Sequence, residues 1–157
     1  MSRHDSSKAP VSFSVANRLF FRLYQCSNLL HKNGTRHMSA FGTTTQQWAV
    51  LGALTRPQVR ERGITVKELI AFLMLSRQNL TAVLDRLEAR AWIERVSDPQ
   101  DGRNRLIRLS PEGNRVWDAM QAPIEGFYSG ALAGLNEAEQ IQLYQLLDRL
   151  RDGLGEV

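Results

Sequence analysis

The 157-residue sequence has one cysteine, three histidines and no long hydrophobic run. Cys26 has no second cysteine with which to form a disulfide inside the chain, which is typical of proteins in a reducing cytoplasm. No apolar segment approaches the roughly 18 residues that span a bilayer, so we expect no membrane association. The first twelve residues lack the apolar core of a secretory signal. We therefore expect a cytoplasmic protein.

Sequence patterns of catalysis and metal binding are also scarce. The chain has no Gly-rich phosphate loop and no Gly-x-Ser-x-Gly elbow. Its histidines and cysteine lack the spacing of metal ligands; they are His4, His31, His37 and Cys26. Asp85 and Glu88 share a predicted helix with two arginines, which indicates surface ion pairs. Those arginines are Arg86 and Arg90. We expect no enzyme, no metal and no cofactor.

Basic residues are concentrated in the first two thirds of the chain. Residues 1–55 carry six Lys and Arg against one acidic residue, a net charge of +5. Residues 56–115 carry twelve against eight, a net charge of +4, and residues 116–157 carry two against seven, a net charge of −5. A basic, arginine-rich centre hints at a nucleic-acid partner, although many basic proteins bind none.

The first half of the chain predicts helices in a globular domain, since 43% of residues are hydrophobic and 23% charged. Apolar residues recur at helical spacing over residues 13–32, and Asn33-Gly34 is expected to stop that helix. Thr43 to Gln46 is a capping-box pattern before a second helix, which Pro57 should end ahead of a charged loop. Residues 1–12 are expected to form a flexible arm.

The middle of the chain predicts two helices joined by a short turn. Thr65 and Glu68 form another capping box, and Ser76 is an N-cap for a helix over residues 76–90. Apolar residues form one stripe along this second helix; they are Leu80, Val83, Leu84 and Leu87. The turn of a few residues between the two helices is typical of a helix-turn-helix.

A β-hairpin and two further helices are predicted next. The strands are expected over residues 93–96 and 106–109, with turn residues between Asp98 and Gly102. Ser110-Pro111 begins a long helix, and a capping box at Asn136 begins the last one. The hairpin after a helix-turn-helix suggests a wing. We therefore predict a mainly α (α+β) fold with a winged helix-turn-helix.

The helix over residues 76–90 presents polar side chains at its N-terminal turn, the end that enters the major groove in a recognition helix. Arginine pairs with guanine, glutamine and asparagine pair with adenine, and threonine contacts phosphate or a thymine methyl. The candidates are Ser76, Arg77, Gln78, Asn79, Thr81 and Arg86. The alternative is an amphipathic helix whose polar face is merely solvated.

Arg103 and Arg105 lie at the expected tip of the hairpin. Arginine is favoured in a narrow, electronegative minor groove. Asp98 and Asp101 are expected to orient the two guanidiniums by charge-assisted hydrogen bonds, while Gly102 supplies backbone freedom. The alternative is a solvated hairpin whose aspartates only make turns.

The tip and the residues after it also carry a family pattern. Asp101-Gly102-Arg103 is followed by a strand and by Leu109-Ser110-Pro111-Glu112-Gly113. With the segment LTAVLDRLEARAWIERV, this resembles the recognition helix and wing of the MarR family of winged-helix regulators, and the resemblance covers residues 13–154. Two positions depart from it. Ala82 leaves one phosphate-contacting arginine of the family unmatched, and Ala91 replaces a glycine, which implies a slightly different helix end.

The resemblance assigns roles to the DNA-binding candidates. It implies that Arg103 enters the minor groove with Asp101 as its orienting partner, and that residues 76–86 face the major groove. The winged helix-turn-helix would span residues 43–110, with the recognition helix at about 76–90 and the wing at about 93–109.

The resemblance also implies a homodimer built on a single domain of residues 13–157. Dimerisation would use residues 13–40 and 111–157, although such apolar stripes can equally pack inside a monomer. A dimer would require double-stranded DNA with a near-palindromic operator.

A small-molecule effector is implied as well, in a pocket between the dimer-forming helices and the winged-helix body. Arg18, Arg22 and His37 are expected to meet a carboxylate, and Trp48 to supply a flat apolar wall. The segment QQWAVLGAL resembles family members that govern the catabolism of aromatic acids. We expect a repressor that an aromatic acid or its coenzyme A thioester releases. The alternative is that these aromatics are core residues and the arginines surface residues.

Two other functions stay open. Cys26 in the first helix suggests an oxidant-sensing regulator, but the family branch that senses hydroperoxides has its cysteine at the position of Phe20. A buried cysteine acting as a small hydrophobic residue is therefore the preferred interpretation. The other alternative is a helical protein-binding module that binds no DNA and would show no salt-dependent affinity for a duplex.

Overall fold

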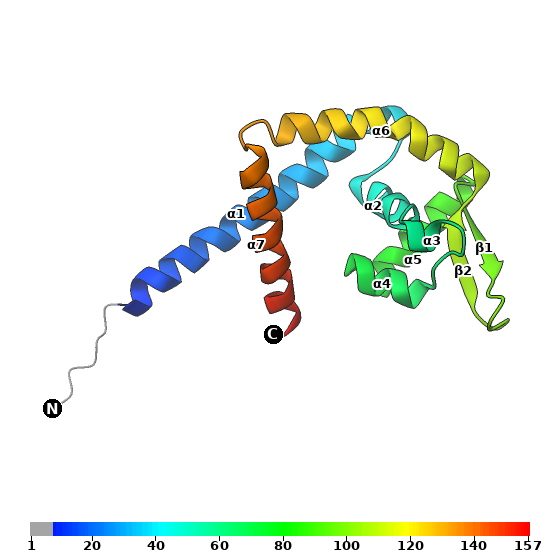
Figure 1. Ribbon diagram of the computed structural model, residues 1–157, viewed down its shortest axis with the longest axis horizontal. Coiled ribbons are helices and arrows are strands. Elements are labelled where there is room, and N and C mark those ends of the chain that lie inside the picture. The colour runs from blue at the N-terminus through cyan, green and yellow to red at the C-terminus, as the bar shows by residue number, and fades with distance from the viewer. Residues whose placement is uncertain (1–7) are drawn as a thin grey trace. The chain divides into compact units, whose positions relative to one another are not determined.

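The computed structural model describes the backbone from Lys8 to Val157 and the side chains from Phe13 onward (Figure 1). The chain divides into two compact units, one that ends at Ala119 and one over Met120–Val157. The boundary falls within a helix that contains Pro123. Because proline has no N–H, Pro123 cannot donate to the carbonyl of Ala119, so the helical hydrogen-bond ladder is broken next to the boundary.

The elements follow the predicted order, and the mainly helical winged-helix fold is confirmed. They are α1 (Lys8–His37), the 3₁₀ turn η1 (Ser39–Phe41), α2 (Thr45–Leu54), α3 (Pro57–Arg60), α4 (Val66–Leu73), α5 (Arg77–Ala89), β1 (Ile93–Ser97), β2 (Arg105–Leu109), α6 (Pro111–Ala131) and α7 (Glu137–Gly155). Along the described helices, no segment is long and apolar enough to cross a membrane.

The two strands form an antiparallel ladder that a third segment extends. Ile93 pairs with Leu109, and Ser97 pairs with Arg105 at the other end. Ile64, just before α4, exchanges both backbone hydrogen bonds with Ile107 of β2, at 2.9 and 2.8 Å. The base of the hairpin is therefore held to the helix-turn-helix by backbone pairing as well as by side chains.

The core of the first unit lies among α2, α4, α5 and the hairpin. The apolar stripe predicted on α5 is buried, as are side chains from α2, α4 and β2 that face it. The residues with almost no exposed surface include Leu51, Leu54, Leu69, Leu80, Leu84, Leu87, Leu106 and Ile107. This buried layer determines which face of α5 is left to solvent.

Three predicted boundaries were wrong. The helix α1 begins at Lys8 and continues through Asn33-Gly34 to His37, so residues 8–12 are helical rather than part of an arm, and residues 1–7 lie outside the described residues. A proline within the first turn of a helix needs no N–H partner, which explains how Pro10 is accommodated. The cap of α2 is Thr44 with Gln47, one residue later than predicted.

The third error concerns Pro57, which begins the short helix α3 instead of ending α2. α2 ends earlier, at Leu54, and the expected charged loop is partly helical. Proline is favoured at the first position of a helix because its φ angle is already helical and no donor is lost there. The capping boxes at Thr65 and Asn136 and the cap at Ser76 form as predicted.

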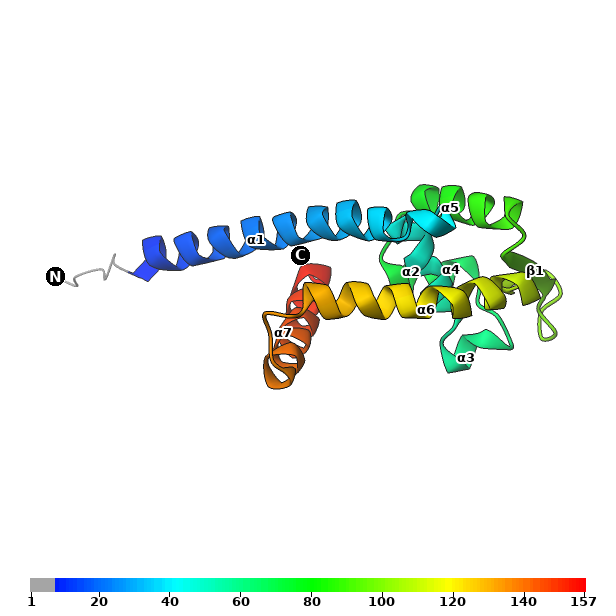
Figure 2. The same ribbon diagram turned by 90° about the horizontal axis from the view of Figure 1, so that it is seen from above.

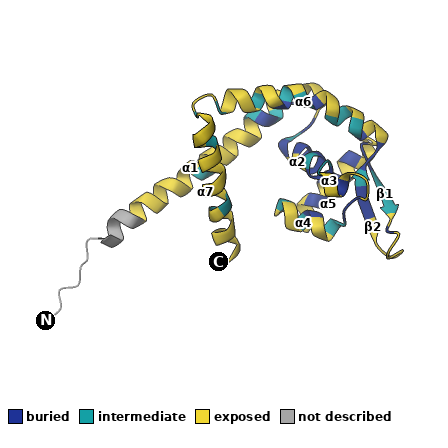
Figure 3. Ribbon diagram, in the orientation of Figure 1, coloured by how far each residue is buried: buried dark blue, intermediate teal, exposed yellow. Residues whose placement is uncertain are grey.

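The terminal helices expose the apolar residues that the sequence predicts to form stripes. Over residues 137–155, α7 has no buried residue, and most of α1 is exposed over its described side chains (Figure 3). α1 runs as one continuous helix (Figure 2). Its exposed large apolar side chains are Phe13, Val15, Leu19, Phe20, Phe21, Tyr24, Leu29 and Leu30.

Candidate nucleic-acid interface

The turn between α4 and α5 positions the start of the candidate recognition helix. Met74 ends α4 in the left-handed conformation, with φ of 55°, and its N–H donates to the carbonyl of Ile70 at 2.8 Å. Ser76 then caps α5, since its Oγ accepts a hydrogen bond from the Asn79 backbone N–H at 3.1 Å. This cap satisfies one N–H of the first turn and fixes the direction in which α5 leaves the turn.

All six candidate DNA-binding residues of this segment are exposed. The opposite face of α5 is buried in the core, so the polar face cannot turn inward without exposing the leucines. Ser76, Arg77, Gln78, Asn79, Thr81 and Arg86 thus share the solvent side of the helix. The arrangement meets the steric requirement for a helix that enters a major groove.

The N-terminal end of α4, the first helix of the helix-turn-helix, has a charged cap. The carboxylate of Glu68 accepts hydrogen bonds from the Thr65 backbone N–H and from its hydroxyl, each at 3.0 Å. These bonds lower the pKa of Glu68 from its ordinary value, and the positive charge of Arg62 contributes further. The negative charge also stabilises the helix dipole at this end.

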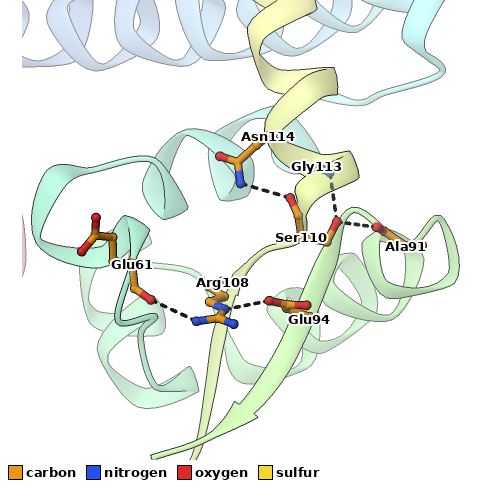
Figure 4. Close-up of polar contacts among 7 residues, drawn as sticks. All are labelled: Glu61, Ala91, Glu94, Arg108, Ser110, Gly113 and Asn114. Atoms are coloured by element: carbon orange, nitrogen blue, oxygen red, sulfur yellow. Dashed lines mark hydrogen bonds and ion pairs between the residues drawn. The ribbon is translucent and has the colours of Figure 1, made fainter.

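Polar contacts at the base of the hairpin hold β2 in place (Figure 4). Arg108 donates from Nε to Glu94 on β1 at 2.7 Å and from Nη1 to the backbone carbonyl of Glu61 at 3.2 Å. Because Glu61 precedes α4, one arginine connects both strands to the helix-turn-helix. With the Ile64–Ile107 pairing, this gives the wing a fixed base.

The tip of the hairpin is organised differently from the prediction. Asp101 accepts a hydrogen bond from the Arg103 backbone N–H at 3.1 Å, and Asp98 accepts one from the Gln100 N–H at 2.9 Å. Among the residues that the structure describes, neither aspartate forms an ion pair with a tip arginine. The predicted orienting of guanidiniums was therefore wrong. Short carboxylates next to turn N–H groups form local Asx turns more readily than they reach a long side chain.

Gly102 does not supply the backbone freedom that was predicted. Its φ is not positive, and a methyl group at that position would meet no atom within 4 Å. Arg103 and Arg105 are nevertheless exposed at or beside the tip. The wing thus presents two exposed arginines on or beside a turn that local hydrogen bonds organise.

The start of α6 explains the glycine in the family pattern. Ser110 Oγ donates to the Ala91 carbonyl at 2.6 Å and accepts from the Gly113 N–H at 2.9 Å (Figure 4). A Cβ atom on Gly113 would lie 1.8 Å from the carbonyl oxygen of Trp92. Glycine is therefore required, because α6 begins against the backbone that follows the recognition helix.

Ala91, just after the end of α5, adopts the left-handed conformation that usually belongs to glycine. The N–H of Trp92 donates to the Leu87 carbonyl at 3.1 Å and that of Ala91 to Glu88 at 2.9 Å, which is the Schellman pattern. Ala91 has φ of 58° at the position that usually holds glycine. The end of α5 therefore closes in a Schellman motif that holds an alanine in the left-handed conformation.

The four predicted effector residues do not meet within one chain. Arg18 and Arg22 are exposed on α1, close to a shallow hollow lined by Asn17, Phe20, Phe21 and Tyr24. His37 ends the same helix, about 22 Å beyond Arg22 at the rise of an α-helix. Trp48 is buried in α2. One small ligand cannot contact both ends of α1 in a single copy.

Cys26 and His31, both on α1, have surroundings that the sequence did not predict. Cys26 is exposed, so its interpretation as a buried hydrophobic residue was wrong. His31 Nδ1 lies 2.6 Å from Thr45 Oγ1 and so links α1 to the start of α2, a contact the sequence did not indicate. Within the described part of the chain, no three His, Cys, Asp or Glu side chains gather as metal ligands.

Residues 41–104 match the MarR family model. The chain is 44% identical to the transcriptional activatory protein BadR of Rhodopseudomonas palustris over 153 residues, which cover 92% of this chain and 87% of BadR. It is 30% identical to the multiple antibiotic resistance protein MarR of Salmonella typhimurium, over 85% of this chain and 88% of that protein.

A solved structure agrees with the sequence matches. The PcaV transcriptional regulator of Streptomyces coelicolor, solved in complex with its natural ligand, has a TM-score of 0.69 and 32% identity, over 97% of this chain and 98% of PcaV. The matched segment of the family model contains α2 to the wing tip, where the recognition helix and the hairpin lie. The chain belongs to the MarR family of transcriptional regulators, and it is not an enzyme.

Proposed function

We propose that the protein binds a near-palindromic operator in double-stranded DNA. The observation that carries this proposal is the exposed polar start of α5 beside an arginine-tipped hairpin with a fixed base. In this proposal Arg77, Gln78 and Asn79 contact base edges. Arg103 enters the adjacent minor groove. Ser76, Thr81, Arg86 and Arg105 contact phosphates, and Asp101 acts by shaping the tip.

Salt dependence tests the DNA-binding proposal directly. A dimer that neutralises roughly six to ten phosphates should lose about 10³- to 10⁵-fold in affinity between 50 and 200 mM salt. The measurement is a fluorescence titration of a duplex that the protein selects from a random pool. A nearly flat salt dependence would contradict the proposal and favour a protein-binding module.

We propose a homodimer as the form that binds DNA, with α1 and α7 in the contact. Both helices expose large apolar side chains, and their charges are complementary. α1 carries five Lys and Arg and no acidic residue, whereas α7 carries four acidic residues against two arginines. A second copy would bury the apolar faces and bring opposite charges together. Light scattering at low protein concentration tests this state.

An aromatic acid or its coenzyme A thioester is the proposed effector. Supporting an aromatic acid are the aromatic side chains of α1 beside Arg18 and Arg22. The natural ligand in the PcaV structure supports a small-molecule effector in general. Because His37 and Trp48 lie away from these arginines, a site that uses all four residues must take them from two copies. Such a site would depend on the dimer.

Thermal stability tests the effector proposal. An aromatic acid at about 100 times its Kd should stabilise the protein by roughly 2.7 kcal/mol, whereas an aliphatic acid of similar size should not. Arg22→Ala should weaken the shift, and Lys32→Ala, which removes the same charge further along α1, serves as the control. Equal shifts in both variants would exclude a specific role of Arg22.

The direction of regulation has two candidates. We propose release from DNA by the effector, which makes the protein a repressor acting in the cytoplasm. The name of the BadR relative, a transcriptional activatory protein, favours activation as the second candidate. Transcription in vitro from a promoter that carries the selected operator distinguishes them. Added protein lowers transcript yield in the first case and raises it in the second.

A further inference from the structure

Arg90, at the C-terminal end of α5, connects this helix to a distant segment of the chain. Its Nη1 donates to the Gly42 carbonyl at 3.1 Å, and its Nη2 donates to the Phe41 carbonyl at 2.5 Å. Both carbonyls belong to the connector between α1 and α2. The guanidinium also lies over the ring of Trp92, with its carbon 3.6 Å from the ring centroid. The predicted ion pairing of Arg90 on its own helix was wrong, since Glu88 pairs with Arg95 instead.

The connector offers a site that suits a guanidinium. η1 ends in a left-handed Gly42, and the last carbonyls of a helix lack partners within the helix. Two parallel N–H donors from one planar group match two successive carbonyls, and the face of the same group stacks on an aromatic ring. Partial burial lowers the pKa of Arg90 from its ordinary value, although the residue as a whole is exposed.

The other side of this junction is also fixed. Trp92 accepts the Ser110 N–H at 3.0 Å, and Ala91 accepts the Ser110 hydroxyl at 2.6 Å. The C-terminal end of α5 is therefore joined to the start of α6 by backbone contacts and to the α1–α2 connector by Arg90. The attachment of α5 to the connector depends on the single side chain of Arg90, whereas its attachment to the start of α6 does not.

We propose that Arg90 is a positioning residue for DNA recognition, which sets the angle of α5 by holding its C-terminal end to the connector that follows α1. This inference rests on the proposed DNA binding. Arg90 need not touch DNA, because a small rotation about the junction displaces the N-terminal end of the 13-residue α5. Lysine cannot replace it, since an ammonium is a point charge without the planar fork.

The first test compares Arg90→Lys and Arg90→Ala with Arg95→Ala, a control that removes a nearby, partly buried arginine bound to α5 through Glu88. The probes are a duplex that the wild-type protein selects from a random pool and a random duplex of equal length. Both Arg90 variants should bind the selected duplex about tenfold more weakly, because neither lysine nor alanine can make the paired hydrogen bonds to the connector that set the angle of α5. Binding of the random duplex should change by about twofold or less, and the control should change neither.

Amide hydrogen-exchange rates distinguish a positioning role from a lost phosphate contact, because the loss of a phosphate contact would leave these rates unchanged. In Arg90→Lys, amides of residues 39–43 and of the last turn of α5 should exchange faster together, while those at the start of α5 keep their rates. The inference is overturned if Arg90→Lys binds the selected duplex like wild type, or if affinity for both duplexes falls equally. If the wild-type protein selects no duplex, the proposed function itself fails.

Discussion

Apolar residues are buried in the winged-helix body and exposed on the terminal helices. In the body, the leucines of α2 and α5 and Leu69 of α4 are almost completely buried, and the described exposed large apolar side chains there are Phe72 and Met74. On α1 and α7, leucines, phenylalanines and tyrosines of the same size are about half exposed. The body is thus complete within one chain, while the terminal helices carry apolar surface of the kind that marks an interaction site.

This difference indicates where single substitutions should act. A change in the body should appear in the free energy of unfolding or in DNA affinity. A change on the apolar face of a terminal helix should appear in self-association and leave the body folded. The following predictions test this division, from the largest expected effect to the smallest.

Gly113→Ala should destabilise the body by about 3–5 kcal/mol, the range of severe core substitutions. The added methyl group would lie 1.8 Å from the Trp92 carbonyl oxygen, so the start of α6 or the end of α5 must move. Urea unfolding measures the change. Gly126→Ala is the control: it lies in the second unit with no atom within 4 Å of a new Cβ, and it should stabilise α6 by about 1 kcal/mol.

Leu147→Asp should weaken the proposed dimer by about 3 kcal/mol, because each copy loses the burial of one leucine. Leu147 lies on the apolar side of α7, which has no buried residue in the single chain. Sedimentation measures the dimer dissociation constant. Gln142→Asp adds the same charge on the polar side of α7 and should leave dimerisation unchanged. Equal effects of the two substitutions would remove α7 from the contact.

The sequence predicted the body better than its surroundings, for physical reasons. The apolar period of α5, the cap at Ser76 and the turn residues of the hairpin are local signals, and each formed where predicted. The Arg90 contacts depend on a segment that folding brings close and that lies 48 residues away in sequence. The tip hydrogen bonds join residues only two apart, and they were missed because the aspartates were expected to pair with guanidiniums instead. For α1, the Asn33-Gly34 stop signal was overridden because the helix beyond it contacts the start of α2, where the Thr45 N–H donates to Thr35 Oγ1 at 3.3 Å.

Arg103→Ala should lower DNA affinity by about 1–3 kcal/mol while the melting temperature hardly changes. The side chain is exposed at the wing tip, so it contributes little to the core. Arg103→Lys should recover only part of the loss because lysine is more strongly hydrated. Asp101→Ala should give a smaller defect, since it removes the acceptor of the Arg103 N–H. Titration of each variant with the selected duplex measures these affinities. Wild-type affinity in Arg103→Ala would show that the hairpin does not contact DNA.

Ala91→Gly should stabilise the body by about 0.5–1 kcal/mol. Ala91 has φ of 58°, a conformation that costs an L-residue roughly 1–2 kcal/mol, and the greater freedom of glycine in the unfolded chain offsets part of the gain. Ala89→Gly, at the last residue of α5, should instead destabilise the protein by roughly 0.5 kcal/mol. Thermal unfolding of both variants gives the comparison, and the same sign in both would mean that Ala91 is not strained.

Glu68→Gln should cost about 0.5 kcal/mol at pH 7, a small effect because the capping carboxylate is exposed to solvent. The pKa of Glu68 is lowered in the folded protein, so the stabilisation is present above the ordinary value of 4.5 and is lost as pH falls through the folded value. The difference in unfolding free energy between wild type and variant should therefore be constant from pH 7 to about 5 and should shrink below 4.5. Glu139→Gln, in the corresponding capping box of α7, should leave the unfolding of the body unchanged over the same range, since that box belongs to the other unit. A pH-independent difference for Glu68→Gln would mean that the neutral side chain caps α4 as well as the carboxylate does.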